Sequence, residues 1–129
     1  MDTKAHELVF PEESYQIMGA CFAVYREMGS GFLEAVIQEC LEREMASRGI
    51  PFLRQHPIPI RYRGQFLRQV YLADFVCFGK IIVEIKTMEE IVDGHRAQVL
   101  NYLAATGLRL GLLVNFGHKD RLQWQRLVR

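Results

Sequence analysis

The feature that most constrains this chain is a pair of short apolar segments that carry charged side chains. The segments 71–78 and 81–86 are rich in β-branched and aromatic residues, and only a Gly-Lys turn signal separates them. This composition on both sides of a short turn predicts a β-hairpin. We therefore expect Asp74, Glu84 and Lys86 on two adjacent strands.

Alternation along the second strand places Glu84 and Lys86 on one face, about 6 to 7 Å apart. Burying a carboxylate without a partner costs several kcal/mol, and two neighbouring carboxylates raise each other's pKa. A divalent cation between Asp74 and Glu84 would resolve this conflict. The alternative is an ordinary cross-strand salt bridge of Asp74 with Lys86 or Lys80 on a solvated face of the sheet.

Length and composition indicate one domain spanning residues 1–129. Half of the 129 residues are hydrophobic, and no linker rich in Pro, Gly or Ser divides the chain. Apolar runs stay well short of the roughly 20 residues that cross a bilayer, and the first residues are polar rather than typical of a signal peptide. We expect a cytoplasmic protein that does not associate with membranes.

The cysteines argue against a metal site built from thiolates, and the net charge gives no general argument for nucleic-acid binding. Three cysteines without a Cys-x-x-Cys spacing argue against a thiolate metal site and favour small buried hydrophobic residues in a reducing compartment. A net charge of +1 is too small for nucleic-acid binding by bulk electrostatics. The arginines fall into two groups, which either form a local binding patch or lie on solvated strand faces. The first group is Arg54, Arg61, Arg63 and Arg68, and the second is Arg121, Arg126 and Arg129.

Periodicity and turn signals predict an alternating α/β order. We expect Pro57 and Pro59 to place their strand at a sheet edge, because each lacks a ladder donor. A strand, a crossover helix and a further strand at the C-terminal half predict a mixed sheet. The expected elements are helices over about 11–28, 32–48 and 94–106, and strands over 51–62, from about 66 to 78, and over 81–86, 108–116 and 122–128.

Helical spacing predicts which side chains face the core. On the first helix we expect Tyr15, Met18, Phe22 and Tyr25. On the second we expect Leu33, Val36, Ile37, Cys40, Leu41 and Met45, with Glu34 in the first turn. On the third, Val99, Leu100 and Leu103 can pack on the sheet, while His95, Gln98 and Tyr102 lie toward one side as a functional or merely solvated face.

Four short motifs together resemble the PD-(D/E)XK nuclease superfamily. They are Gly31-Phe32-Leu33-Glu34, Ala73-Asp74, Glu84-Ile85-Lys86 and the helical segment from Gln98 to Tyr102. The chain is similar in particular to the small bacterial GxxExxY family, and its Gln-x-x-x-Tyr helix resembles the RecB-like exonuclease branch. Two positions depart from these patterns, because Ile37 replaces the expected tyrosine and Ala73 stands where the superfamily often has proline.

This resemblance implies a fold and a set of roles. The fold is a single-domain restriction-endonuclease-like α/β core, with a central mixed β-sheet flanked by α-helices. Asp74 and Glu84 would bind Mg²⁺ (or Mn²⁺), with Glu34 as an additional acid. Lys86 would act with them in catalysis, beside the attacking water. Substrate positioning would come from Gln98, Tyr102 and His95, although a lone helical histidine is more often exposed or hydrogen-bonded.

The expected function is therefore Mg²⁺-dependent hydrolysis of phosphodiester bonds in nucleic acid, with DNA as the expected substrate. The alternative is a catalytically weak or inactive nuclease-fold module that binds nucleic acid or a protein partner, or that forms a homodimer. A third reading is an assembly protein in which Asp74, Glu84 and Lys86 form a salt-bridge network.

Overall fold

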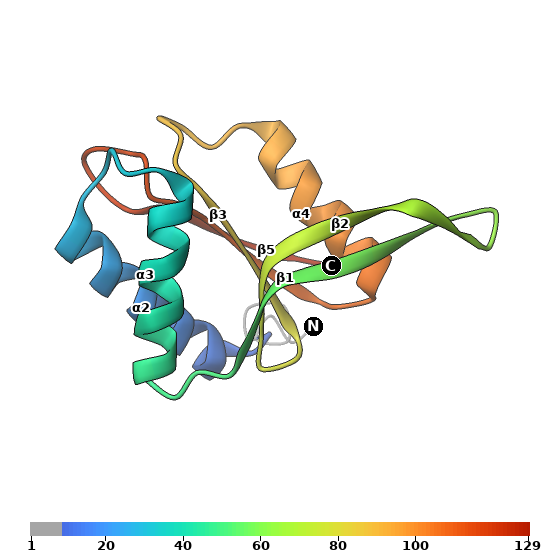
Figure 1. The fold of residues 1–129 in the computed structure, drawn as a ribbon, viewed down its shortest axis with the longest axis horizontal. Helices are drawn as coiled ribbons and strands as arrows, with labels where there is room; N and C mark the ends of the chain where they lie inside the picture. Colours follow the sequence, from blue (N-terminus) through green and yellow to red (C-terminus); the bar gives the residue numbers. More distant parts are fainter. Residues whose placement is uncertain (1–8) are drawn as a thin grey trace, which may run out of the picture.

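The computed structural model describes residues 9–129 and confirms the predicted order of elements (Figure 1). The second helix begins at Glu34 rather than Phe32, because Leu33 is still extended. No helix in the described range is both long and apolar enough to cross a bilayer. The elements are α2 (Pro11–Met28), α3 (Glu34–Ser47), β1 (Phe52–Tyr62), β2 (Gln65–Cys77), β3 (Ile81–Lys86), α4 (Asp93–Thr106), β4 (Leu110–Asn115) and β5 (Gln123–Val128).

The five strands form one mixed sheet in the order β1-β2-β3-β4-β5. Strands β3 and β4 are parallel, and the other neighbouring pairs are antiparallel. Parallel neighbours need a crossover, and α4 provides it between β3 and β4. The predicted α/β fold, a mixed sheet flanked by helices, is confirmed.

Helices cover both faces of the sheet. Ile81, Val83 and Ile85 of β3 belong to the core formed with α2 and α3, whereas Ile82 contacts the α4 side. Helix α4 approaches β4 so closely that a Cβ at Gly111 would lie 2.4 Å from Val99 Cγ1. This glycine therefore allows the helix to pack on the sheet.

The predicted core faces of the helices are wrong in part. Tyr15, Phe22, Leu33, Val36 and Leu100 are exposed. The prediction gave aromatic residues too much weight, because the buried face of α2 is made mainly of smaller side chains that fit closely against the sheet: Ile17, Met18, Ala20, Cys21 and Val24.

The cysteine prediction holds for two of the three residues. Cys21 and Cys77 are buried, and burial raises the pKa of Cys77 to about 12. Cys40 is half-buried at the margin of the core. None of the three forms a disulfide within the described range.

Strands β1 and β2 extend beyond the sheet as a two-stranded arm, which we define as residues 57–72 (Figure 1). Within the arm β2 pairs with β1 alone, since its pairing with β3 is confined to Phe75–Cys77. Arg63 and Gly64, both with positive φ, form the two-residue turn at its tip. The predicted edge position of β1 is confirmed.

Candidate active site

Two carboxylates occupy the place where β2 and β3 separate. The backbone ladder between these strands ends at the pair Phe75 and Val83. Beyond it, the Asp74 backbone N–H donates to Glu84 Oε1 at 2.8 Å, and the Ile85 N–H donates to Asp74 Oδ2 at 2.8 Å. Side-chain oxygens thus replace ladder carbonyls, and both carboxyl groups are held between the two strands.

A backbone kink at Gln55 accompanies this arrangement. Gln55 has a φ of +45°, a left-handed conformation that costs a non-glycine residue about 1 to 2 kcal/mol. Phe75 faces the core under α2 and α3, whereas Ile58 and Ala73 face α4. The alternation of side chains between the two faces of the sheet is therefore reversed where Gln55 lies opposite Asp74. This reversal turns the arm relative to the sheet.

Gln55 also contributes to the site directly. Its side chain lines the same pocket as Asp74, where burial raises the Asp74 pKa and the Gln55 amide partly opposes that effect. Nothing in the sequence signalled this residue, because glutamine is not a typical left-handed residue and the kink depends on pairing with a distant strand.

Lys86 is held in place by α4. Its Nζ donates to Gln98 Oε1 at 3.0 Å, which joins two residues that were predicted to share a site. Tyr102 follows Gln98 one turn later on α4. Tyr102 is only 3% exposed, so it supports the site from the core rather than offering its ring to solvent. Burial, together with the charges of Glu84 and Asp74, raises the pKa of Tyr102 to about 12.

The electrostatics of the carboxylates follow from their burial. Glu84 is 3% exposed, and burial followed by repulsion from Asp74 raises its pKa to about 8. Burial also raises the pKa of Asp74, although the Ile85 N–H and the charge of Lys86 oppose this effect. The pair therefore favours a shared proton or an additional cation at neutral pH.

The predicted alternative of an ordinary salt bridge is not supported. Among residues 9–129, no ion pair within 4.0 Å joins Asp74 to Lys86 or Lys80. Lys80 instead pairs with Glu13 of α2 at 2.6 Å and lies over the Phe10 ring.

Glu34 lies at the edge of the same site. It begins α3 and, with Gln38, Gln55 and Asp74, lines an open pocket of about 580 Å³. Burial and then the charge of Asp74 raise the pKa of Glu34, while the charge of Lys86 lowers it. Gln38, a buried residue that the sequence analysis missed, donates from Nε2 to the Asp74 carbonyl at 3.4 Å.

The donors present fit a hard divalent cation, although the three predicted acids do not form a ready cluster. Carboxylate oxygens are the ligands that Mg²⁺ and Mn²⁺ prefer, and Asp74 and Glu84 each use one oxygen for a backbone N–H, which leaves a second. In the described part of the chain, no three His, Cys, Asp or Glu side chains are arranged to hold a metal ion. The structure thus brings together a pair of acids, with Glu34 nearby on the pocket wall.

His95 has a structural role at the start of α4. Its Nδ1 accepts a hydrogen bond from the Val92 N–H at 3.2 Å, which satisfies one of the free donors at the helix N-terminus. Burial, followed by the charge of Lys86, lowers its pKa and favours the neutral ring. Its role in positioning substrate stays a prediction.

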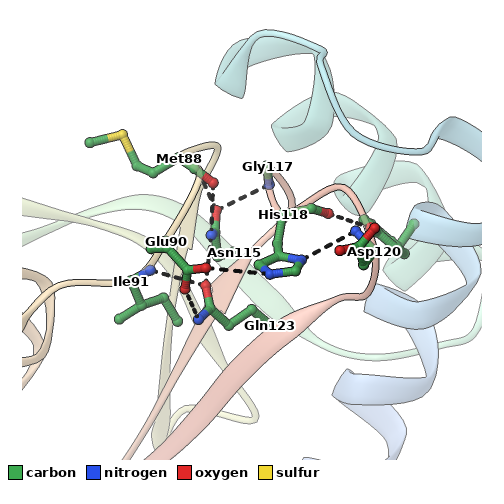
Figure 2. A network of polar contacts seen from close by, with 9 residues as sticks. Met88, Glu90, Ile91, Asn115, Gly117, His118, Asp120 and Gln123 are labelled. Atoms are coloured by element: carbon green, nitrogen blue, oxygen red, sulfur yellow. Dashed lines mark hydrogen bonds and ion pairs between the residues drawn. The ribbon is translucent and has the colours of Figure 1, made fainter.

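A buried polar network anchors the connection that follows Lys86 (Figure 2). Asn115 is 0% exposed; its Nδ2 donates to the Met88 carbonyl at 2.8 Å, and its Oδ1 accepts from the N–H groups of Met88 and Gly117. Gln123 Oε1 accepts from Asn115 and from the Ile91 N–H. The network fixes the chain between β3 and α4, and the only signal for it in the sequence was a polar residue ending an apolar strand.

Comparisons with known proteins give a matching family model and a solved structure with a similar fold. The family model described as the PD-(D/E)XK nuclease superfamily matches residues 11–127. The crystal structure of SSO0001 has a similar fold, with a TM-score of 0.61 and 20% sequence identity over 74% of this chain. The match covers 49% of the SSO0001 chain, so this chain spans about half of that protein's length. The search of curated proteins found no match.

Proposed function

This chain belongs to the PD-(D/E)XK nuclease superfamily, and from this premise we propose that it hydrolyses phosphodiester bonds in DNA with the help of Mg²⁺ or Mn²⁺. The observation that carries the proposal is a pair of carboxyl groups, buried Glu84 and half-buried Asp74, held between two separating strands with Lys86 on the same strand as Glu84. A purely structural role would not require two acids side by side with one of them buried, because their mutual repulsion destabilises the fold.

Asp74 and Glu84 would hold the cation, and Glu34 would add an oxygen ligand across the pocket. When bound, a divalent ion supplies positive charge that offsets the charge developing on the phosphate. The Asp74 and Ile85 backbone N–H groups keep the two carboxyl groups oriented before any ligand arrives. Such preorganisation lowers the cost of assembling the site during the reaction.

Lys86 would orient the attacking water and stabilise negative charge through its ammonium group. An ammonium group has three N–H donors, and the bond to Gln98 Oε1 uses one of them. Two donors therefore stay available for water and for a phosphate oxygen. Gln98 acts as a positioning residue, because it fixes where the flexible lysine side chain points.

The test is cleavage of labelled single-stranded, duplex and branched DNA in Mg²⁺ or Mn²⁺ by the full chain and two variants. Asp74→Asn keeps the shape of the side chain but removes its charge, and Lys86→Ala removes the ammonium group. We expect each to lower the cleavage rate by about 100-fold or more. The matched control is Lys119→Ala, which removes an exposed lysine from the loop after β4. If the protein cleaves no DNA in either Mg²⁺ or Mn²⁺, or if all variants cleave DNA at the same rate, the proposal is refuted.

A second candidate is a catalytically weak or inactive module that keeps the fold and binds nucleic acid or a protein partner. The observation that favours it is the lack of a ready three-acid cluster within residues 9–129. Titration calorimetry with Mn²⁺ combined with the cleavage assay distinguishes the two, because this module would bind Mn²⁺ through Asp74 and Glu84 and still bind DNA without cleaving it.

Three further assignments belong to the same proposal. The first four-residue motif, which ends at Glu34, supports placement in the GxxExxY family, although Ile37 departs from its pattern. Residues 1–129 would act as one domain. A cytoplasmic location is supported by the unpaired thiols of Cys21 and Cys77.

A further inference from the structure

The arm and its base carry an unusual concentration of positive charge. Residues 52–72 contain four arginines and neither aspartate nor glutamate. The chain has 16 basic and 15 acidic side chains, so the remainder carries a net charge of −3. Arg54, at the base, pairs with Glu42 of α3 at 3.2 Å. Within residues 9–129, no ion pair involves the three arginines of the arm itself, Arg61, Arg63 and Arg68.

Exposed aromatic rings accompany these arginines near the tip of the arm. Tyr62 is 62% exposed and Phe66 is 64% exposed. The Arg61 guanidinium lies 4.6 Å from the Phe66 ring centroid, and that of Arg63 lies 5.5 Å from the Tyr62 centroid. Each pair combines a flat aromatic ring with a positive charge. In proteins that bind single strands, bases stack on such rings and phosphates lie near such charges.

A groove lies between the arm and α4, two elements that lie side by side in Figure 1. Ile60, Phe66 and Tyr71 line it from the arm, and Asn101 and Thr106 line it from α4. Its volume is about 790 Å³.

Two tyrosines in contact, Tyr71 and Tyr102, lie between the groove and the candidate active site. The Tyr71 ring lies 5.2 Å from the Tyr102 ring. Tyr102 in turn lies one turn along α4 from Gln98, whose Oε1 accepts a hydrogen bond from Lys86 Nζ at 3.0 Å. A strand lying in this groove would therefore pass Tyr71 on the side of the sheet from which Gln98 contacts Lys86.

We propose that this groove and the arm tip bind an unpaired strand of nucleic acid and lead it to the carboxylate pair, an inference that rests on the proposed function. The arginines of the arm, with no acid among them, favour a polyanion, and the exposed rings favour bases that are not stacked on a neighbouring base. In a duplex those faces are covered by stacking, so exposed rings favour an unpaired strand. The exposed apolar residues of the arm are Tyr62, Phe66, Leu67, Val70, Tyr71 and Leu72.

The test is equilibrium binding of fluorescent oligo(dT) and of a duplex of equal length in EDTA, where cleavage does not contribute. Tyr62→Ala and Phe66→Ala should each weaken oligo(dT) binding by roughly 5- to 100-fold. Arg63→Ala should lower the dependence of log K on log salt by about 0.7. The matched controls are Tyr15→Ala on α2 and Arg43→Ala on α3, both exposed and far along the chain from the arm. Urea unfolding verifies that all variants are folded.

Tighter binding of oligo(dT) than of duplex, lost in the arm variants and kept in the controls, supports the inference. Equal or tighter binding of duplex overturns it, as does binding that the arm variants leave unchanged. Conversion of a dimer into a monomer by Tyr62→Ala or Phe66→Ala, with oligo(dT) binding retained, overturns it in favour of an interface between copies. Cleavage without arm-dependent binding refutes this inference alone, whereas arm-dependent binding without cleavage refutes only the proposed function.

Discussion

Replacing Glu84 by glutamine should remove most of the pH dependence of stability in the metal-free protein. Burial and the charge of Asp74 raise the Glu84 pKa from 4.5 to about 8. The folded protein therefore binds this proton more tightly than the unfolded chain does. Protonated Glu84 contributes its stability fully below about pH 4.5, and this contribution is lost as the pH rises toward 8.

The magnitude follows from the difference between the two pKa values. A tenfold change in proton affinity corresponds to about 1.4 kcal/mol, so the free energy of unfolding should fall by about 1.4 kcal/mol per pH unit and by at most about 5 kcal/mol in total. Glutamine keeps an oxygen that can accept the Asp74 N–H, which Glu84 now accepts at 2.8 Å. The variant should therefore be nearly as stable as the wild type at low pH and more stable above pH 8.

The assay is urea unfolding in EDTA at about pH 5, 6.5 and 8.5, with Glu39→Gln as the control. Glu39 is exposed and pairs with Arg43, so its loss should have little effect. Addition of Mg²⁺ at about 100 times its dissociation constant should restore about 2.7 kcal/mol to the wild type at high pH and less to Glu84→Gln. Parallel stability curves for wild type and Glu84→Gln would show that burial of this carboxyl does not govern stability.

Three other changes test the structure around the site. Asn115→Leu should cost about 2 to 4 kcal/mol in urea unfolding, because it leaves partly buried backbone groups of Met88 without partners; a loss below about 1 kcal/mol contradicts the network. Gly117→Ala should lower the melting temperature by several degrees, because the added Cβ would lie 2.4 Å from the Met88 carbonyl oxygen, and an unchanged melting curve contradicts this close approach. Gln98→Ala should slow cleavage by about 10- to 100-fold while oligo(dT) affinity in EDTA stays the same, because Lys86 loses its positioning bond. An unchanged rate would mean that Lys86 is held by other contacts.

The order of helices and strands could be predicted from the sequence because it depends on local signals. Alternating apolar residues, the turn signals at Gly64 and Gly79 and the edge prolines act within a few positions of the elements that they define. The pairing of Asp74 with Glu84 also followed, since a hairpin brings both strands together. The faces of α2 were less predictable, because several apolar stripes compete on a helix and packing against the sheet selects one.

What only the tertiary structure decided are the contacts between segments distant in the sequence. Gln55 and Gln38 come to Asp74 from β1 and α3, and Asn115 supports the chain after Lys86 from β4. The length of the arm could not be predicted from the sequence either. It depends on where the pairing of β2 with β3 ends, and that pairing ends at Phe75 because two carboxylates replace the ladder bonds beyond it. The residue types of the site were thus present in the sequence, whereas their convergence depends on long-range packing and on backbone geometry that no local pattern encodes.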